Sequence, residues 1–245
     1  KGHILIGDGS GNPQMLAIGD DDQVLTADSG ETTGVKWADA GGGGGASAIG
    51  GLSDASTTGT GNLWLGSTSG AGTYNTGVGL LALDSVISGG EKNTAIGYGA
   101  GTAISNGDQN VTIGYNCGNY LTTGNYNVLI GAQVAISANA TDLENCVIIG
   151  NLAGQLLDGG VAGSVYIGKQ AGYGGTGSDG DYNTAVGYTS MYSITTGDQN
   201  ACLGMDAGRG ITQGDQNSCV GYKAGHGITT GNYNVVVGRC EDLSE

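Results

Sequence analysis

The sequence predicts an all-β protein whose main part is a parallel β-solenoid built from coils of 17 residues. One phrase recurs along the chain, as NTAIGYGAG at Asn93–Gly101, NVTIGYNCG at Asn110–Gly118 and NSCVGYKAG at Asn217–Gly225. The dominant step from Asn to Asn is 17 residues, and Gly recurs at fixed places in it; the chain of 245 residues has 53 Gly and one Pro. A fixed period this short is typical of stacked repeat proteins.

Residues 1–38 form a separate unit without this repeat. Short β-prone runs at Ile4–Ile6, Met15–Ile18, Val24–Leu25 and Val35–Trp37 are separated by clusters of Gly, Asp, Asn and Ser. This alternation predicts a small meander of strands joined by turns. Because a unit of this size buries little surface, we expect it to need partners for its stability.

The same unit resembles a segment of bacteriophage tail fibre proteins. QVLTADS at Gln23–Ser29 and GVKWA at Gly34–Ala38 match phrases of that segment with matching spacing, and the resemblance covers Gly2–Ala40. His3 and Asp22 depart from the residues that are usual in the family. The resemblance implies a structural protein of the virion tail that is assembled in the cytoplasm of the host.

Residues 39–61 predict a Gly-rich linker, because five consecutive Gly residues hold neither a helix nor a strand without partners. The repeat array then extends over residues 62–245. Two coils are expected to be longer, with inserted residues at 156–163 and 174–181, and insertions in a solenoid often mark its binding face. The first of these coils is expected to open at Asn145 and to carry one extra residue before Ile149. The expected coil starts are Asn62, Asn75, Asn93, Asn110, Asn127, Asn145, Ser164, Asn183, Asn200, Asn217 and Asn234.

The Asn that opens a coil predicts an internal ladder of side chains. Amides that lie one strand spacing apart, about 4.8 Å, can donate and accept hydrogen bonds along the solenoid axis. This role is structural, and we assign no catalytic role to these residues. The ladder is expected at Asn93, Asn110, Asn127, Asn183, Asn200, Asn217 and Asn234.

The third residue after each Asn is aliphatic, as at Ile96 and Ile113, and its neighbours are small or apolar. A strand that is apolar on both faces is buried on both faces. We therefore expect one face to line the chain's own coil and the other to meet another chain, and we expect two short strands in each coil. The following Gly predicts a corner that needs positive φ or has no room for a Cβ. The corner glycines are Gly97, Gly114, Gly131, Gly187, Gly204 and Gly221.

The repeat phrase also resembles the NSVAIG-type repeats of trimeric autotransporter adhesin heads and the NTAVGYxAL repeats of phage tail fibres. Both resemblances imply parallel β-solenoid coils that assemble as an elongated homotrimeric fibre. The adhesin coils are shorter than 17 residues, so the tail fibre resemblance is the closer one. It implies an extracellular virion fibre whose partners are its own copies, other tail fibre or baseplate proteins, and a glycan or protein of the host surface.

Tyr is the most prominent candidate for recognition. It follows the Gly corner or precedes the Asn, so stacked copies predict aromatic columns that suit the apolar faces of sugars. The alternative is that these rings pack over neighbouring coils or over seams between chains. The candidate binding residues are Tyr98, Tyr115, Tyr126, Tyr182, Tyr188, Tyr222 and Tyr233.

Acidic residues offer a weaker candidate. Asp181, Asp198 and Asp215 share one place in their coils, which favours Ca²⁺ capture. Asn125 and Asn232 occupy the same place elsewhere, and a turn requirement explains both residue types. We therefore expect no cofactor and no metal, with Ca²⁺ at the three Asp residues as the alternative.

The five Cys residues fit no zinc-binding pattern. Cys117, Cys202 and Cys219 fall where other coils carry small residues, so we expect them in the core. A disulfide between Cys202 and Cys219 is the less favoured alternative.

The composition argues against several functions. With 22 acidic and 7 basic residues the net charge is −15, which disfavours nucleic acid as a partner. The sequence contains no run of about 18 consecutive apolar residues, so we expect no insertion into a membrane. Only His3 and His226 are present and no nucleophile motif appears, so we expect no catalytic residue and no enzyme. A bacterial trimeric adhesin head and a tailspike-like polysaccharide depolymerase, with Asp179 and Asp181 as its carboxylates, stay open as alternatives.

Because the chain begins at Lys1 without Met or a signal peptide, we expect a fragment of a longer protein.

Overall fold

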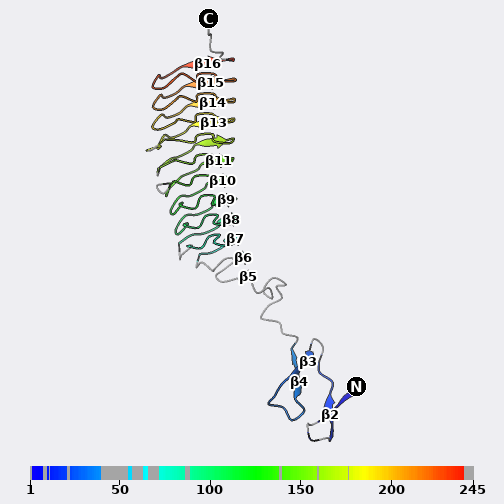
Figure 1. Ribbon diagram of the computed structural model, residues 1–245. Coiled ribbons are helices and arrows are strands. Elements are labelled where there is room, and N and C mark those ends of the chain that lie inside the picture. Colours follow the sequence, from blue (N-terminus) through cyan, green and yellow to red (C-terminus); the bar gives the residue numbers. More distant parts are fainter. Residues whose placement is uncertain are drawn as a thin grey trace. The chain divides into compact units, whose positions relative to one another are not determined.

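The computed structural model describes residues 2–7, 10, 12–20, 23–39, 55–56, 63–65, 72–85, 89–137, 140–158, 160–175 and 177–239. These residues form strands and turns without a helix, and the predicted all-β solenoid is confirmed (Figure 1). The chain divides into two compact units, Lys1–Leu52 and Ser53–Glu245, which are described separately. Of the expected linker at 39–61, only Asp39 and Ala55–Ser56 lie among the described residues.

The N-terminal unit contains two antiparallel hairpins. Trp37 of the second hairpin donates its Nε1–H to the carbonyl oxygen of Ala17 in the first, at 2.7 Å. Leu5 and Met15, which are partners across the first hairpin, are both exposed. This unit thus leaves much of its own apolar surface open. Its strands are β1 (His3–Gly7), which pairs with β2 (Pro13–Ala17), and β3 (Gln23–Ala27), which pairs with β4 (Val35–Asp39).

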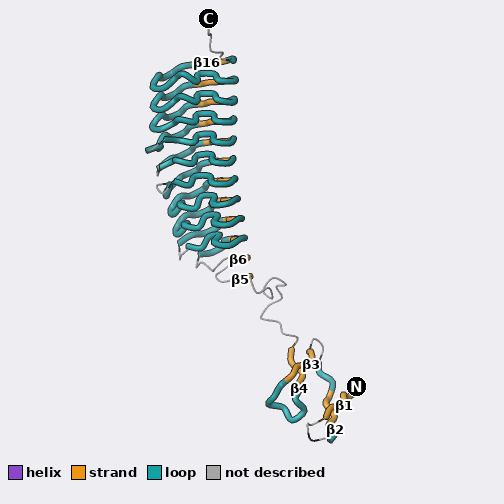
Figure 2. The backbone as a smooth tube through the Cα atoms, viewed as in Figure 1, coloured by secondary structure: helices purple, strands orange, loops and turns teal. Residues whose placement is uncertain are grey.

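The second unit is a stack of coils around one 12-stranded sheet. Strands β6 to β16 pair in parallel in sequence order, and β5 pairs antiparallel with β6. Figure 2 shows the strands as a narrow band on one side of the stack, with turns making up the rest of each coil. The strands are β5 (Ala55–Ser56), β6 (Leu63–Leu65), β7 (Thr76–Val78), β8 (Thr94–Ile96), β9 (Val111–Ile113), β10 (Val128–Ile130), β11 (Val147–Ile149), β12 (Val165–Ile167), β13 (Thr184–Val186), β14 (Ala201–Leu203), β15 (Ser218–Val220) and β16 (Val235–Val237).

The prediction of two strands per coil is wrong, since the described coils each hold one. The second aliphatic position, for example Ile104, is fully buried but lies in a turn, where its N–H donates to Gly101 O at 3.0 Å. Gly97, Gly99 and Gly101 all have positive φ. In the next coil Asn116 takes the place of Gly99 and has φ 50°. Alternating left-handed residues bend the chain too sharply for an extended strand.

The opening Asn side chains form a buried column. Asn110 Nδ2 donates to Gly124 O at 2.7 Å and to Asn93 Oδ1 at 3.1 Å. Asn110 Oδ1 in turn accepts the backbone N–H and the side-chain N–H of Asn127. Each buried amide in this column therefore accepts a backbone N–H of the next coil through its Oδ1 and donates to a backbone carbonyl through its Nδ2. The buried members are Asn75, Asn93, Asn110, Asn127, Asn183, Asn200 and Asn217, and Asn234 closes the column in the last described coil.

The column is interrupted in the middle, and the predicted coil start at Asn145 is wrong. Val147 pairs with Val128, so Cys146 occupies the ladder place and no residue is inserted before Ile149. Cys146 N–H donates to Asn127 Oδ1 at 2.9 Å, while the exposed Asn145 has φ 56°. Asn145 is thus a corner residue outside the buried column, although its residue type is that of the column.

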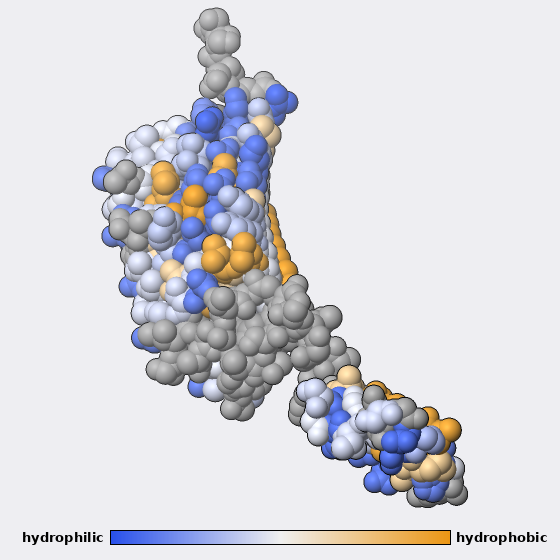
Figure 3. Space-filling view, turned by 60° about the horizontal axis from the view of Figure 1, so that its bottom comes forward, coloured by the Kyte–Doolittle hydropathy of each residue, from blue (hydrophilic) through white to orange (hydrophobic). Residues whose placement is uncertain are grey.

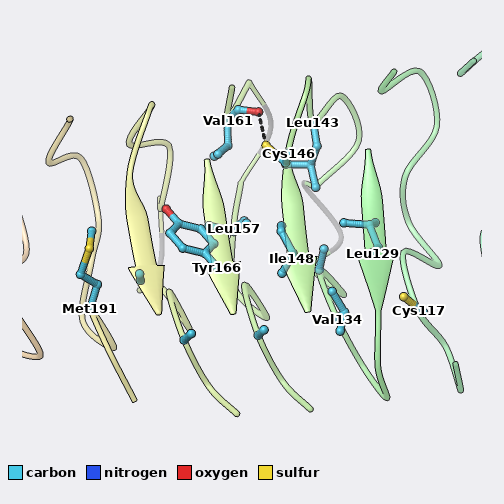
Figure 4. Packing of buried hydrophobic residues seen from close by; sticks show 14 of the residues in the cluster. Cys117, Leu129, Val134, Leu143, Cys146, Ile148, Leu157, Val161, Tyr166 and Met191 are labelled. Atoms are coloured by element: carbon cyan, nitrogen blue, oxygen red, sulfur yellow. Dashed lines mark hydrogen bonds between the residues drawn. The ribbon is translucent and has the colours of Figure 1, made fainter. Parts of the chain in front are cut away.

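Ser164 is the second interruption, and the large residue of its strand explains it. The inward Tyr166 fills the core beside Leu157 and Ile148 (Figure 4). A serine at the ladder place leaves room for this ring, and Ser164 Oγ still accepts the N–H of Asn183 at 3.1 Å. Burial raises the pKa of Tyr166, whose hydroxyl has no hydrogen-bond partner among the described residues.

The core is a set of columns that run along the stack. The middle residue of each strand points inward, and small or aliphatic residues from the turns between the strands complete the core. Burial raises the pKa of Cys117 to about 12 and that of Cys146 to about 11, so both thiols are protonated and unreactive at neutral pH. The inward strand residues are Ala95, Thr112, Leu129, Ile148, Tyr166, Ala185, Cys202 and Cys219.

Cys202 and Cys219 are register partners in adjacent strands, and both are free thiols. The hydrogen bond with the neighbouring Cys219 thiol and burial both raise the pKa of Cys202. Cys240 lies outside the described residues.

The corner glycines have both properties that the sequence suggests. Gly114 has φ 131°, and a Cβ built on it would collide with the carbonyl oxygen of Gly131 in the next coil. The coils are packed so closely at this corner that backbone meets backbone. The six predicted corner glycines, Gly97, Gly114, Gly131, Gly187, Gly204 and Gly221, have φ between 126° and 141°.

Candidate functional site

The outward side of the sheet presents a row of mostly apolar side chains. Within each strand the middle residue is inward, so the first and third residues point out and are half-buried or exposed. The inner face lines the chain's own coil, as expected, and the burial of the outer face against another chain stays a prediction. Val, Ile, Leu, Thr, Ala and Ser make up this surface, with no charge among them. We call it the strand face: Thr76, Val78, Thr94, Ile96, Val111, Ile113, Val128, Ile130, Val147, Ile149, Val165, Ile167, Thr184, Val186, Ala201, Leu203, Ser218, Val220, Val235 and Val237.

The strand face is continuous along the stack. Figure 3 shows hydrophobic residues along part of the edge of the solenoid on which Figure 1 places the strands. Ile96, Leu203 and Val220 each expose about two fifths of their surface, at 40%, 42% and 40%. Contiguous apolar surface of this length is typical of an interaction site.

The tyrosines predicted as binding residues lie along the two edges of the strand face. One edge is the place just before the ladder residue and the other is the place just after the corner Gly; we call these edges the rims. All of the predicted tyrosines are exposed, from 38% at Tyr222 to 73% at Tyr233. The first rim holds Tyr74, Tyr126, Tyr182 and Tyr233, and the second holds Tyr98, Tyr115, Tyr188 and Tyr222.

The rim tyrosines do not all present a free ring face. Tyr98 and Tyr115 stack on each other, with ring centroids 5.6 Å apart and an interplanar angle of 16°. Lys223 Nζ and Arg239 Cζ lie 5.5 Å and 5.4 Å from the ring centroid of Tyr222. Because these faces are covered by a ring or a cation of the same chain, these contacts favour the alternative in which Tyr packs over neighbouring coils.

The Asp residues that are candidates for Ca²⁺ form a second ladder outside the core. Asp198 Oδ1 accepts the N–H of Asp181 at 2.8 Å, and Asp215 Oδ1 accepts the N–H of Asp198 at 2.9 Å. Asn232 Oδ1 accepts the N–H of Asp215 in the same way, at 2.7 Å. Both Asp and Asn offer this acceptor oxygen, which explains why the two residue types interchange at this place.

The described residues form no metal centre. No group of three or more His, Cys, Asp and Glu side chains there is placed to hold a metal ion. Asp181 is committed to the N–H of Ala162 at 2.8 Å. His226 Nδ1 lies 3.1 Å from Lys223 O.

The chain was compared with protein families, with characterised proteins and with solved structures, and no match was found in any of the three. No helix in the described part of the chain is long and apolar enough to cross a membrane.

A third group of aromatic residues was missed at the level of sequence. Tyr173 and Tyr192 occupy the same place in successive coils, and their rings stack with centroids 4.8 Å apart and an interplanar angle of 12°. Arg209 follows at this place in the next coil, with its Cζ 5.6 Å from the Tyr192 centroid. The backbone alignment is set by Gly174 N–H donating to Tyr192 O and Ser193 N–H donating to Arg209 O, both at 3.2 Å.

Arg209 is held from a second side. Its Nε lies 3.7 Å from Oδ1 of the buried Asp206, which also accepts the hydroxyl of Thr189 at 2.5 Å. The signal available in the sequence was the spacing of these residues. Aligning the coils on Ser164, Asn183 and Asn200 places the two tyrosines and the arginine in one column, but the longer coil before Asn183 hides this register.

Proposed function

We propose that the chain is a structural and receptor-binding part of a bacteriophage tail fibre, in which three copies form a rod that presents contacts to the host surface. The observation that carries this proposal is the strand face, an uncharged strip of β-branched residues with tyrosines along both rims. Such a strip is costly to leave in water and well suited to meet its own copies. The resemblance of QVLTADS at Gln23–Ser29 and GVKWA at Gly34–Ala38 to tail fibre proteins supports the assignment to this class.

The length of the strand face fits self-association along the stack. Ten strands at a spacing of about 4.8 Å give a length of about 45 Å. Copies aligned along this length cover the outer side chains of all ten strands from β7 to β16. The number of copies, three, follows from the resemblance of the repeats to trimeric fibres.

The function of such a rod is mechanical and adhesive. Stacked coils give a stiff support, and three copies turn weak contacts with a surface into a stronger combined attachment. The glycines, the Asn ladder and the Asp ladder all serve the stack itself. Recognition is therefore left to residues that depart from the repeat and lie away from the strand face.

The function is tested with a panel of purified bacterial surface polysaccharides immobilised on a sensor. We expect the full chain to bind at least one of them and to leave its chain length unchanged after prolonged incubation. Shortening of the polysaccharide would support a depolymerase instead. Absence of binding to bacterial polysaccharides and to whole bacterial cells would contradict the adhesive role.

A further inference from the structure

The aromatic residues that remain for recognition are few. Of the 12 Tyr residues, all of which the structure describes, eight lie on the rims and Tyr166 is buried. If the strand face is the interface between copies, the rims lie at its seams, and the remaining tyrosines are Tyr120, Tyr173 and Tyr192. Tyr173 and Tyr192 form a stack, and they lie midway along the chain between consecutive strands, outside the residues of the strand face and the rims.

Arg209 gives this stack a specific chemistry. In the described coils it is the only Lys or Arg outside the rims and their immediate neighbours. Its guanidinium lies over Tyr192 and beside the buried Asp206, yet its side chain is 54% exposed. A guanidinium that is fixed from two sides and still open to solvent is prepared to bind a carboxylate with little loss of side-chain entropy.

The repeat does not require these residues. At the place of Tyr173, Tyr192 and Arg209, other coils carry residues such as Thr102, Asn119 and Gln155. These coils also form backbone hydrogen bonds to their neighbours. Asp206 likewise stands where the neighbouring coils have Thr189 and Lys223. The Tyr–Tyr–Arg column with its buried carboxylate is thus a local departure from the repeat, and it adjoins the longer coil after Tyr173.

We propose that Tyr173, Tyr192 and Arg209 form a binding site for a glycan that carries an isolated carboxylated sugar. Arg209 donates to the carboxylate, and the ring edges and hydroxyls of the two tyrosines contact the sugar next to it. A glycan with a charge on every sugar is a poor ligand, because the chain carries a net charge of −15 that repels a polyanion. This proposal rests on the proposed function, since it names the ligand class of the rod.

The test uses the full chain and three immobilised probes of similar length: an N-acetyllactosamine oligosaccharide ending in one sialic acid, its asialo form, and an oligogalacturonate. We expect the sialylated glycan to bind about ten-fold more tightly than both others, as one charge-assisted pair provides. Equal binding of the sialylated and asialo forms, tighter binding of the oligogalacturonate, or no binding of any probe would overturn the proposal.

Two matched variants locate the site. Arg209→Gln is expected to remove the ten-fold preference, whereas Arg239→Gln, which removes the same charge from Tyr222 on a rim, is expected to keep it. An equal loss in both variants would show a general charge effect and contradict the assignment. Circular dichroism and the thermal midpoint confirm that each variant is folded, and Tyr192→Ala serves as a second variant of the site if Arg209→Gln is unstable. Light scattering and the polysaccharide panel separate this proposal from the proposed function, because a trimer that binds a bacterial polysaccharide but none of these three probes removes only the site.

Discussion

At the scale of single residues, the two ladders use the same acceptor oxygen in opposite surroundings. Asn200 is buried, and its Nδ2 donates to Gly214 O at 2.7 Å and to Asn183 Oδ1 at 3.1 Å. Asp198 lies in the outer ladder, where its side chain acts only as an acceptor: its Oδ1 accepts the N–H of Asp181. The inner ladder therefore needs an amide, whereas the outer ladder accepts an amide or a carboxylate.

A pair of near-isosteric substitutions tests this difference. Asn200→Asp places a buried carboxylate against two acceptor oxygens, so we expect a loss of about 3 kcal/mol in the free energy of unfolding at pH 7. Asp198→Asn keeps its hydrogen bond, and we expect a change within about 0.5 kcal/mol. Urea unfolding followed by circular dichroism measures both, and similar losses in the two variants would contradict the assigned roles.

The corner glycines give a second prediction at this scale. Gly114→Ala forces a Cβ onto the carbonyl oxygen of Gly131 at φ 131°, so we expect the variant to be insoluble or to lose several kcal/mol of stability, above the usual range of about 0.5–3 kcal/mol for single substitutions. Gly227→Ala is the control, because nothing lies within 4 Å of a Cβ built there. If both variants fold with equal thermal midpoints, the coils are less closely packed at the corner than described.

At the scale of the coil, the buried thiols link stability to alkaline pH. The pKa of Cys117 rises from its ordinary value of 9.0 to about 12 through burial. The folded state keeps the proton while the unfolded state loses it, so the stabilisation is full below pH 9 and is lost as the pH rises toward 12.

Cys117→Ala isolates this effect, because Ala100 and Ala171 occupy the same core column in other coils. We expect the stability of the parent chain to fall more steeply between pH 8 and pH 10.5 than that of the variant, by at most about 1.4 kcal/mol per pH unit. Urea midpoints at the two pH values measure the difference. Parallel pH profiles would show that this thiol ionises as freely in the folded chain as in the unfolded one.

The coil also shows what a sequence reveals about such a fold. The period, the ladder residues and the corner glycines follow from residue types that recur, because each has one physical reason that repeats in every coil. The single strand per coil does not follow, because it depends on left-handed residues such as Asn116 and Gln109 that hydrophobic patterns do not mark. Cys146 was missed for a related reason, since the neighbouring Asn145 carries the expected side chain one place too early.

The candidate surfaces were predictable to a similar degree. The Tyr columns are visible in the sequence, and the exposure of Tyr98 and Tyr126 agrees with an outward position. Their place on the rims of the strand face needs the register of the strands. The group around Arg209 needs in addition the register across a longer coil, and its buried partner Asp206 has no sequence signal of its own.

At the scale of the whole molecule, the central claim is that copies of the chain associate through the strand face. Light scattering gives the molar mass in solution and tests this claim most directly when two variants accompany the parent chain. Ile130→Lys places a charge in the middle of the strand face, and Thr123→Lys places the same charge on an exposed residue outside it. We expect about three times 24.1 kDa for the parent chain and for Thr123→Lys, and a shift toward 24.1 kDa for Ile130→Lys. A parent chain of 24.1 kDa, or a trimer that Ile130→Lys leaves intact, would contradict the account.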